Sequence, residues 1–264
     1  MIPIIIICYN NYKYVDNTIQ QIARINESYV PYIQIMNNSS TDPDTVKYLE
    51  QVQVKVIHTE NNGPRISKIH NKHIYDILPD KFILTDADLE FNPNLPTDFI
   101  EQLVILSEVY KCRKIGFALK IDDYADMIQG EYFNGLSIYE WESSAWYIRI
   151  QDPSFELYSA AIDTTFAVIN KNGTDINIRV AGNFTARHLP WYTKNPLLTL
   201  EDQYKLYTAE PLTEAYQYIN SMCEHKYAKF STTSELFLRH IHEEYEKETI
   251  DGGLTFIPKR QESP

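Results

Sequence analysis

The chain has 264 residues and a formal net charge of −12, with 44% apolar and 23% charged residues. This length and composition are ordinary for a soluble globular protein with one large domain or two small ones. The acidic balance argues against broad binding of nucleic acid or anionic membranes, because both need a basic face.

The three cysteines are far apart and show no CxxC spacing, which indicates neither a disulfide framework nor a zinc site. The apolar start at residues 2–8 is too short to span a membrane, and no positively charged signal-peptide region precedes it. These features predict a reducing, cytoplasmic location without a transmembrane segment.

The first ninety residues predict alternating strands and helices. Short apolar runs predict strands at residues 2–8, 32–36, 52–58 and 82–85. Helical spacing, and a proline in a first turn, predict helices at residues 14–25, 43–49 and 64–78. This order predicts an α/β fold, with a mostly parallel central sheet flanked by helices on both faces.

The regular alternation fades after Pro93. Apolar patterning here predicts strands at residues 114–120, 160–170 and 176–181. It also predicts helices at residues 98–110, 199–208 and 211–222. From residue 252 the composition favours a poorly ordered tail.

Polar clusters follow the four predicted N-terminal strands, where such sheets bind ligands. They are Tyr9-Asn10-Asn11, residues 37–42, residues 61–65, and Asp86-Ala87-Asp88. Strand alternation does not explain the two aspartates, because charges are costly near a core. Carboxylates at i and i+2 suit a hard cation such as Mn²⁺ or Mg²⁺, which could bridge to a diphosphate. The alternative is a capped turn.

These clusters, in this order, resemble family 2-type glycosyltransferases with the GT-A fold, whose DxD motif matches Asp86-Ala87-Asp88. Asn37 stands where the family usually has an acidic residue. Asp163 and the segment 187–192 are similar to a viral and bacterial subgroup that includes a chlorella-virus rhamnosyltransferase domain. The resemblance covers roughly residues 1 to 225.

The resemblance implies one GT-A domain over residues 1–264. A Rossmann-like half at 1–92 would bind the nucleotide sugar, a mixed half at 93–225 would bind the acceptor, and 226–264 would form a C-terminal helix and tail. It implies a metal-dependent enzyme that moves a sugar from a nucleotide-sugar donor, first of all a UDP-sugar, to a glycan or other hydroxyl acceptor. The expected cofactor is Mn²⁺ or Mg²⁺, and no nucleic-acid partner is expected.

For the metal, the resemblance implies Asp86 and Asp88 as ligands, with His188 as the third and Asp86 also near the ribose. A lone histidine is otherwise more often a satisfied polar group. The expected donor-binding residues besides Asp86 are Tyr9, Asn10, Asn38, Gly63, Arg65 and Lys68. Arg187 and Lys194 lie close enough in sequence to help hold the diphosphate. Plain turn chemistry is the alternative for the asparagines, and simple solvation for the basic residues.

Asp163 is the candidate catalytic carboxylate, because it interrupts an apolar stretch where an unpaired charge is costly. It could equally cap the backbone at Thr164 and Thr165, and Glu201-Asp202 is the rival acidic pair. Trp191 and Tyr192 are the candidate acceptor-binding residues, with Trp141 and Trp146 beside them, although core packing is the default for tryptophan.

Three other functions share some of these features. A haloacid-dehalogenase-type phosphatase also places DxD after a strand, but its motif follows the first strand and needs Thr or Val where Glu90 stands. A sugar nucleotidyltransferase needs a Gly-rich, Arg-containing loop where Tyr9-Asn10-Asn11 stands. A non-catalytic carbohydrate-binding module would bind sugar without metal-dependent nucleotide binding. The residues favour no particular sugar, acceptor or linkage, and are compatible with inversion or retention.

Overall fold

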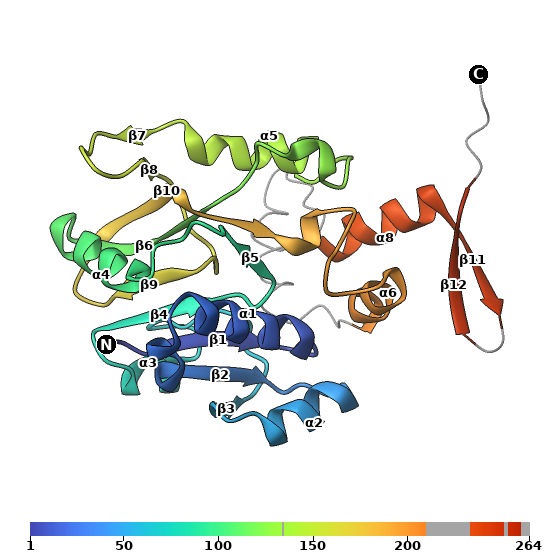
Figure 1. The fold of residues 1–264 in the computed structure, drawn as a ribbon, viewed down its shortest axis with the longest axis horizontal. Helices are drawn as coiled ribbons and strands as arrows, with labels where there is room; N and C mark the ends of the chain where they lie inside the picture. Colours follow the sequence, from blue (N-terminus) through green and yellow to red (C-terminus); the bar gives the residue numbers. More distant parts are fainter. Residues whose placement is uncertain (134, 210–232, 251–252, 260–264) are drawn as a thin grey trace. The chain divides into compact units, whose positions relative to one another are not determined.

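The computed structural model describes residues 1–133, 135–209, 233–250 and 253–259 (Figure 1). The chain divides into two compact units. The first comprises residues 1–122 and 142–188, and the second comprises residues 123–141 and 189–264. The helix predicted at 211–222 lies outside the described residues.

The first unit is built on one sheet, with strand order β3-β2-β1-β4-β9-β6-β10-β8-β7 and β5 paired to β10. The strands are β1 (Ile4–Cys8), β2 (Ile33–Asn38), β3 (Lys55–Thr59), β4 (Lys81–Thr85), β5 (Leu89–Phe91), β6 (Cys112–Leu119), β7 (Arg149–Ile150), β8 (Leu157–Ser159), β9 (Ala167–Asn170) and β10 (Thr174–His188). Parallel pairs join β3, β2, β1 and β4, and also β6 with β10. The remaining pairs are antiparallel. The predicted α/β class with a mostly parallel sheet is confirmed.

Helices flank this sheet, as predicted (Figure 1). They are α1 (Tyr12–Ile25), α2 (Pro43–Gln51), α3 (Lys72–Ile77) and α4 (Phe99–Val109). On one face, Ile5 and Ile7 pack with Ile74 of α3 in a buried cluster. Ile4 and Ile6 point to the opposite face, because side chains alternate along a strand, and they are buried as well. Burial of both faces explains the continuous apolar sequence of β1.

Two predicted elements begin at least seven residues later than expected. The helix predicted at 64–78 begins only at Lys72, because side chains occupy the backbone groups before it: Asn71 Nδ2 donates to the carbonyls of Gly63 (3.1 Å) and Arg65 (2.9 Å). The strand predicted at 160–170 begins only at Ala167. The prediction that Asp163 interrupts a strand is therefore wrong, since Asp163 lies in an irregular segment before β9.

The second unit contains α6 (Leu200–Ala209), α8 (Thr233–Glu244) and a hairpin of β11 (Tyr245–Ile250) and β12 (Gly253–Pro258). The hairpin overturns the prediction of a poorly ordered tail for residues 253–258. The short helix α5 (Ile138–Ser143) crosses the boundary between the two units in sequence. Among the described residues, no helix is both long and apolar enough to span a bilayer.

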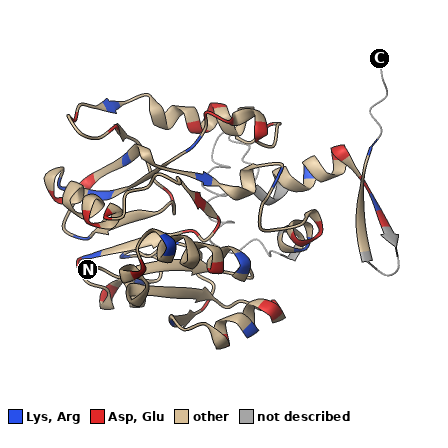
Figure 2. Cartoon of the chain, viewed as in Figure 1, with Lys and Arg blue, Asp and Glu red and all other residues tan. Residues whose placement is uncertain are grey.

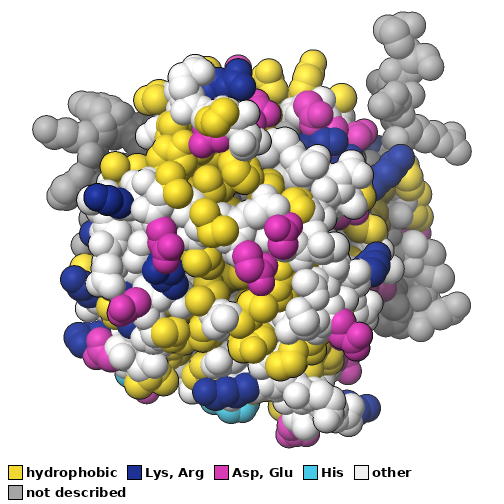
Figure 3. Space-filling view, turned by 60° about the vertical axis from the view of Figure 1, so that its left-hand side comes forward, with side chains coloured by type: hydrophobic (Ala, Val, Ile, Leu, Met, Phe, Trp, Pro, Cys, Tyr) yellow, Lys and Arg dark blue, Asp and Glu magenta, His cyan; other side chains and the backbone are white. Residues whose placement is uncertain are grey.

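Acidic and basic residues are both spread over the described helices and strands (Figure 2). On the face in Figure 3, acidic and basic side chains lie interspersed among hydrophobic ones, without a continuous basic surface.

Candidate metal and donor site

The two aspartates of the DxD motif lie in a short loop between β4, which ends at Thr85, and β5, which begins at Leu89. Two buried polar residues of α1 hold this loop. Thr18 Oγ1 donates to the carbonyl of Ala87 (2.6 Å), and Gln21 Nε2 donates to that of Leu89 (2.9 Å). The sequence signal for this support is a pair of polar residues on the apolar side of the helix, next to Val15 and Ile22.

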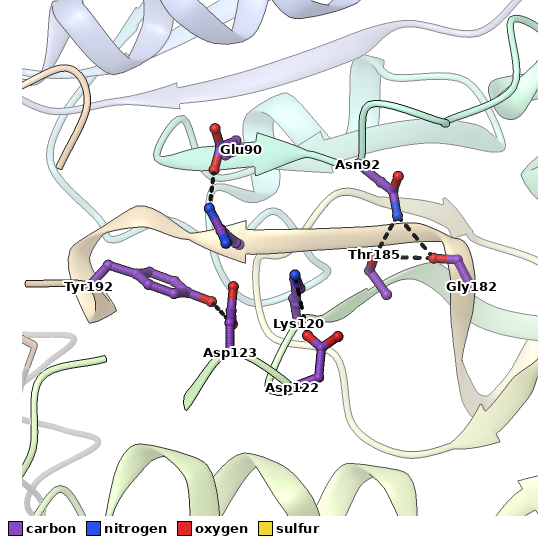
Figure 4. Close-up of polar contacts among 9 residues, drawn as sticks. Glu90, Asn92, Lys120, Asp122, Asp123, Gly182, Thr185 and Tyr192 are labelled. Atoms are coloured by element: carbon purple, nitrogen blue, oxygen red, sulfur yellow. Dashed lines mark hydrogen bonds and ion pairs between the residues drawn. The ribbon is translucent and has the colours of Figure 1, made fainter. Parts of the chain in front are cut away.

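His188 is the last residue of β10. Antiparallel pairing places His188 opposite Leu89 and Arg187 opposite Glu90. Near the other end of β5, Asn92 Nδ2 donates to Thr185 Oγ1 (3.0 Å) and to the Gly182 carbonyl (3.2 Å) (Figure 4). This register brings His188 Nε2 to 3.5 Å from Asp88 Oδ1.

Asp86, Asp88 and His188 each offer one ligand atom, and these atoms lie within 4.8 Å of one another. Burial raises the pKa of Asp86 to about 7, and the nearby Asp88 carboxylate adds to the rise. Burial alone would lower the pKa of His188, but the interactions with Asp88, together with the charges of Asp86 and Glu142, outweigh it, so this pKa is raised overall. The raised pKa values of Asp86 and His188 favour protons on these two groups, and a bound cation would displace them.

The residues fit a divalent cation. Asp88 Oδ1 is buried and accepts no hydrogen bond from the residues that the structure describes, since 3.5 Å to His188 Nε2 is too long for a good one. A buried carboxylate oxygen without a donor is costly, and a metal ion would supply the missing partner. Two carboxylates and one imidazole form a ligand set that Mn²⁺ accepts. Among the described residues, this group brings together all three predicted metal ligands.

Thr164 is a site residue that the sequence did not indicate as a partner of the DxD motif. Its hydroxyl donates to Asp86 Oδ2 (2.5 Å), and its carbonyl accepts the Asp86 N–H (2.8 Å). The adjacent Asp163 is exposed, with 71% of its side chain accessible, and forms an ion pair with Arg65 at 3.1 Å. Asp163 therefore does not have the buried, unpaired charge on which its prediction was based.

The predicted donor-binding asparagines already make contacts within the protein. Asn10 Oδ1 accepts the N–H groups of Thr41 (2.7 Å) and Asp42 (2.9 Å), which joins the loops after β1 and β2. Asn38 is buried, and its Nδ2 donates to the carbonyl of Gly63 (3.2 Å), whereas its Oδ1 has no hydrogen-bond partner. Gly63 has a φ of +78°, a conformation that favours glycine. Tyr9 is half-buried at the end of β1.

The predicted basic residues do not form one group. Arg65 pairs with Asp163, and Arg187 pairs with Glu90 at 3.3 Å. Lys68 and Lys194 are exposed. Lys68 falls within the helix predicted at 64–78, but the structure places it in the loop before α3.

The two predicted acceptor-binding aromatics are buried in the second unit. Trp191 is 5% exposed and packs against Tyr132, with ring centroids 6.1 Å apart. Tyr192 is 4% exposed, and its hydroxyl donates to Asp123 Oδ1 at 2.9 Å (Figure 4). Little of either ring is therefore open to an acceptor, and their acceptor-binding role stays a prediction.

The rival acidic pair has a structural explanation at the start of α6. Asp202 Oδ2 accepts the Thr199 N–H (3.1 Å), and Thr199 Oγ1 accepts the Asp202 N–H (3.1 Å), as in a capping box. Glu201 forms an ion pair with Lys205 at 2.6 Å, one helical turn further on. These contacts account for both carboxylates without catalysis. The predicted companion tryptophans also make ring contacts, Trp141 with Phe133 at 4.2 Å and Trp146 with Tyr158 at 5.0 Å.

Comparison with known families agrees with the resemblance seen in the sequence. The profile described as Glycosyl transferase family 2 matches residues 4–163, which include β1 to β8 and both DxD aspartates. No curated protein gives a significant match to the chain.

Solved structures show distant similarity. Staphylococcus aureus TarS 1-349, in complex with UDP-GlcNAc, is 10% identical with a TM-score of 0.42, over 99% of this chain and 97% of that one. GalNAc-T7 with UDP, GalNAc and Mn²⁺ is 12% identical with a TM-score of 0.42, over 92% and 57%. Glucosyl-3-phosphoglycerate synthase from Mycobacterium tuberculosis, with Mn²⁺ and UDP-glucose, is 17% identical with a TM-score of 0.33, over 48% and 46%. The match thus spans about half the length of the mycobacterial synthase.

Proposed function

Because the chain belongs to glycosyl transferase family 2, we propose that it transfers a sugar from a nucleotide-sugar donor to a hydroxyl group of a glycan or glycoconjugate. The observation that carries this proposal is the grouping of Asp86, Asp88 and His188 within 4.8 Å at the end of β4 and β10. This grouping brings His188 close to the DxD motif of the N-terminal half, although the two are more than ninety positions apart in the sequence. A UDP-sugar is the first donor to test, in keeping with the family resemblance.

The three residues would hold Mn²⁺ or Mg²⁺. A bound cation supplies Lewis-acid stabilisation of the negative charge on the departing nucleoside diphosphate. The protein contributes orientation: Thr164 fixes one oxygen of Asp86, and α1 fixes the loop that carries Asp88. Side chains that are already held in place lose less entropy when they bind the cation. A cation held in this way would restrict the positions that the nucleotide-sugar donor can adopt.

Asp163 is the proposed base that accepts the proton of the acceptor hydroxyl. Its support is positional, because it directly precedes Thr164, which contacts Asp86, and because most of its side chain is exposed. The ion pair with Arg65 restrains the direction of the carboxylate while the residue stays accessible. Arg65, Tyr9, Asn10, Asn38 and Gly63 remain the proposed surroundings of the nucleotide.

The proposal is tested by a screen of common nucleotide sugars with Mn²⁺, in which release of nucleoside diphosphate is measured. We expect release from at least one donor in the wild type, and none above background from Asp88→Asn. Glu90→Gln is the matched control, because Glu90 is a neighbouring carboxylate that pairs with Arg187 and is no part of the proposed ligand set. No release from any donor in the wild type, or equal release from Asp88→Asn, would contradict the proposal.

A further inference from the structure

Two cationic side chains hold the irregular segment 161–164, which connects β8 to β9. Arg179 Nε donates to the carbonyl of Ala161 (2.8 Å), and Lys114 Nζ donates to the carbonyls of Ile162 (3.1 Å) and Asp163. Residues 160–163 have no regular secondary structure. The two cations therefore bind backbone carbonyls that a neighbouring strand would otherwise pair with.

Lys114 and Arg179 come from neighbouring strands and lie on the same face of the sheet. In the β6–β10 register, Asn177 pairs with Lys114 and Arg179 pairs with Gly116, two residues further along each strand. Arg179 is buried and forms an ion pair with the buried Glu142. Lys114 differs, because both of its hydrogen bonds go to main-chain carbonyls.

A partly buried lysine at this position needs an explanation. Burial lowers the pKa of Lys114 to about 8, which shows that the surroundings disfavour its charge. An apolar side chain would avoid this cost, as at the next residue, Ile115, which is fully buried. Unlike an apolar side chain, the Lys114 amine can donate hydrogen bonds to two successive backbone carbonyls.

The segment that Lys114 holds leads directly to the candidate metal site. Thr164 follows Asp163 and binds Asp86 through both its hydroxyl and its carbonyl. Asp163 itself pairs with Arg65. The position of the backbone at residues 162 and 163 thus decides where Thr164 and Asp163 can lie.

We propose that Lys114 is a positioning residue for sugar transfer: it holds the backbone of Ile162 and Asp163 so that Thr164 keeps Asp86 oriented and Asp163 keeps its place. The proposal rests on the proposed function for its effect on turnover. Its structural part, the restraint of Asp86, does not depend on any substrate.

The test compares Lys114→Met, which keeps the length of the side chain and removes the donors, with Lys114→Arg, which can donate to two carbonyls. Lys81→Met is the matched control, since Lys81 is also a partly buried strand lysine, and its partner is the surface carboxylate Glu108 at 2.9 Å. Hydrogen exchange is measured at the amide of Asp86, which donates to Thr164, and at amides of β1 as a reference for global opening.

We expect exchange at the Asp86 amide to be about tenfold faster in Lys114→Met, because the carbonyls of Ile162 and Asp163 would lose the donor that holds them and the segment would open more readily. Exchange in β1 should change little, and Lys114→Arg should restore most of the protection. In turnover, kcat should fall by about tenfold with the donor KM nearly unchanged, since a positioning defect acts mainly on the transition state. Should Lys114→Met not fold, Lys114→Gln keeps a neutral N–H donor group on a shorter side chain and should give an intermediate exchange rate.

Wild-type exchange at Asp86 in Lys114→Met or Lys114→Gln would overturn the proposal. Equal acceleration at Asp86 and β1 without rescue by arginine would overturn it as well, because it would show a general loss of stability. A wild-type protein that releases no nucleoside diphosphate would instead contradict the proposed function, and the exchange rates would still decide whether Lys114 restrains Asp86.

Discussion

At the scale of single residues, two opposing effects act on the ionisation of Asp86. Its carboxylate lies beside Asp88, and burial raises its pKa to about 7, so the metal-free site favours a proton there. Thr164 donates to the same carboxylate and favours its charged form. A cation bound by this site would favour the ionised carboxylate despite its burial, and this would explain why such a costly group is placed at the end of a buried strand.

The affinity for Mn²⁺ is therefore expected to depend on pH. The folded-state pKa of Asp86 is raised above its ordinary 3.8, so in the metal-free protein this group contributes stability at low pH and loses it as the pH rises towards about 7. Mn²⁺ must displace this proton and any proton on His188. We expect the affinity to fall by up to about tenfold per pH unit and per displaced proton below pH 7. Calorimetric titrations between about pH 5.5 and 8.5, in buffers of different ionisation enthalpy, measure the affinity and the protons released. A flat profile without proton release would contradict this assignment.

Asp163→Asn should separate donor binding from transfer. Asparagine keeps a partner for Arg65 but cannot accept the proton of the acceptor hydroxyl, so turnover should drop by about 10²-fold or more with donor affinity nearly unchanged. Asp175→Asn is the matched control, because Asp175 is likewise exposed and paired with an arginine, Arg113, at 3.2 Å. Turnover of Asp163→Asn within about threefold of the control would make Asp163 a structural residue.

At the level of elements, β6 and β9 approach each other unusually closely at Gly116. A Cβ atom at this position would lie 2.2 Å from the Phe166 carbonyl oxygen and 2.4 Å from the Ala167 Cβ. This approach places the start of β9, and with it residues 162–166, against β6. The close packing of β6 against β9 therefore requires a glycine at position 116. The same packing helps to position the segment that leads to the candidate site.

Gly116→Ala should therefore destabilise the fold by about 3 kcal/mol or more, since the clash is with backbone that cannot move aside. Gly182→Ala is the comparison, because Gly182 has a φ of +64° and open space around it, and should cost only about 1 kcal/mol. Denaturant unfolding followed by circular dichroism measures both free energies. The expectation fails if the two substitutions have equal effects.

The elements also show where sequence patterns predict structure well. Continuous apolar runs predicted β1, β2 and β4 within two residues, because strands buried on both faces have little other freedom of sequence. The predicted helix at 64–78 and the predicted strand at 160–170 failed over their first halves. In both places side-chain donors, Asn71 in one and Lys114 with Arg179 in the other, occupy backbone carbonyls. Side-chain donors that compete for backbone carbonyls in this way leave no periodic pattern in the sequence.

At the level of the whole chain, the site depends on a pairing that no local pattern contains. The DxD motif was visible in the sequence because two charges followed an apolar strand. Only the family resemblance indicated His188, and only the β5–β10 register explains how it comes to lie 3.5 Å from Asp88. Thr18 and Gln21 are marked in the sequence only as polar residues on the apolar side of a helix, and their contacts with the loop show their role. Thr164 has no such signal and is recognised only by its burial and its contacts with Asp86.

The net charge of −12 sets a further condition on the proposed donor. A nucleotide sugar carries negative charge on its diphosphate, and the chain as a whole repels anions. The predicted basic residues Arg65 and Arg187 are already paired with carboxylates. If the site binds a divalent cation as proposed, the cation held by Asp86, Asp88 and His188 would be the group best able to attract the diphosphate.

Calorimetric titration of UDP into the protein, with and without Mn²⁺, tests this central claim most directly. We expect binding that requires Mn²⁺ and is lost in Asp88→Asn, while Glu90→Gln binds UDP as the wild type does. UDP binding of equal strength without metal, or unchanged binding in Asp88→Asn, would contradict the claim.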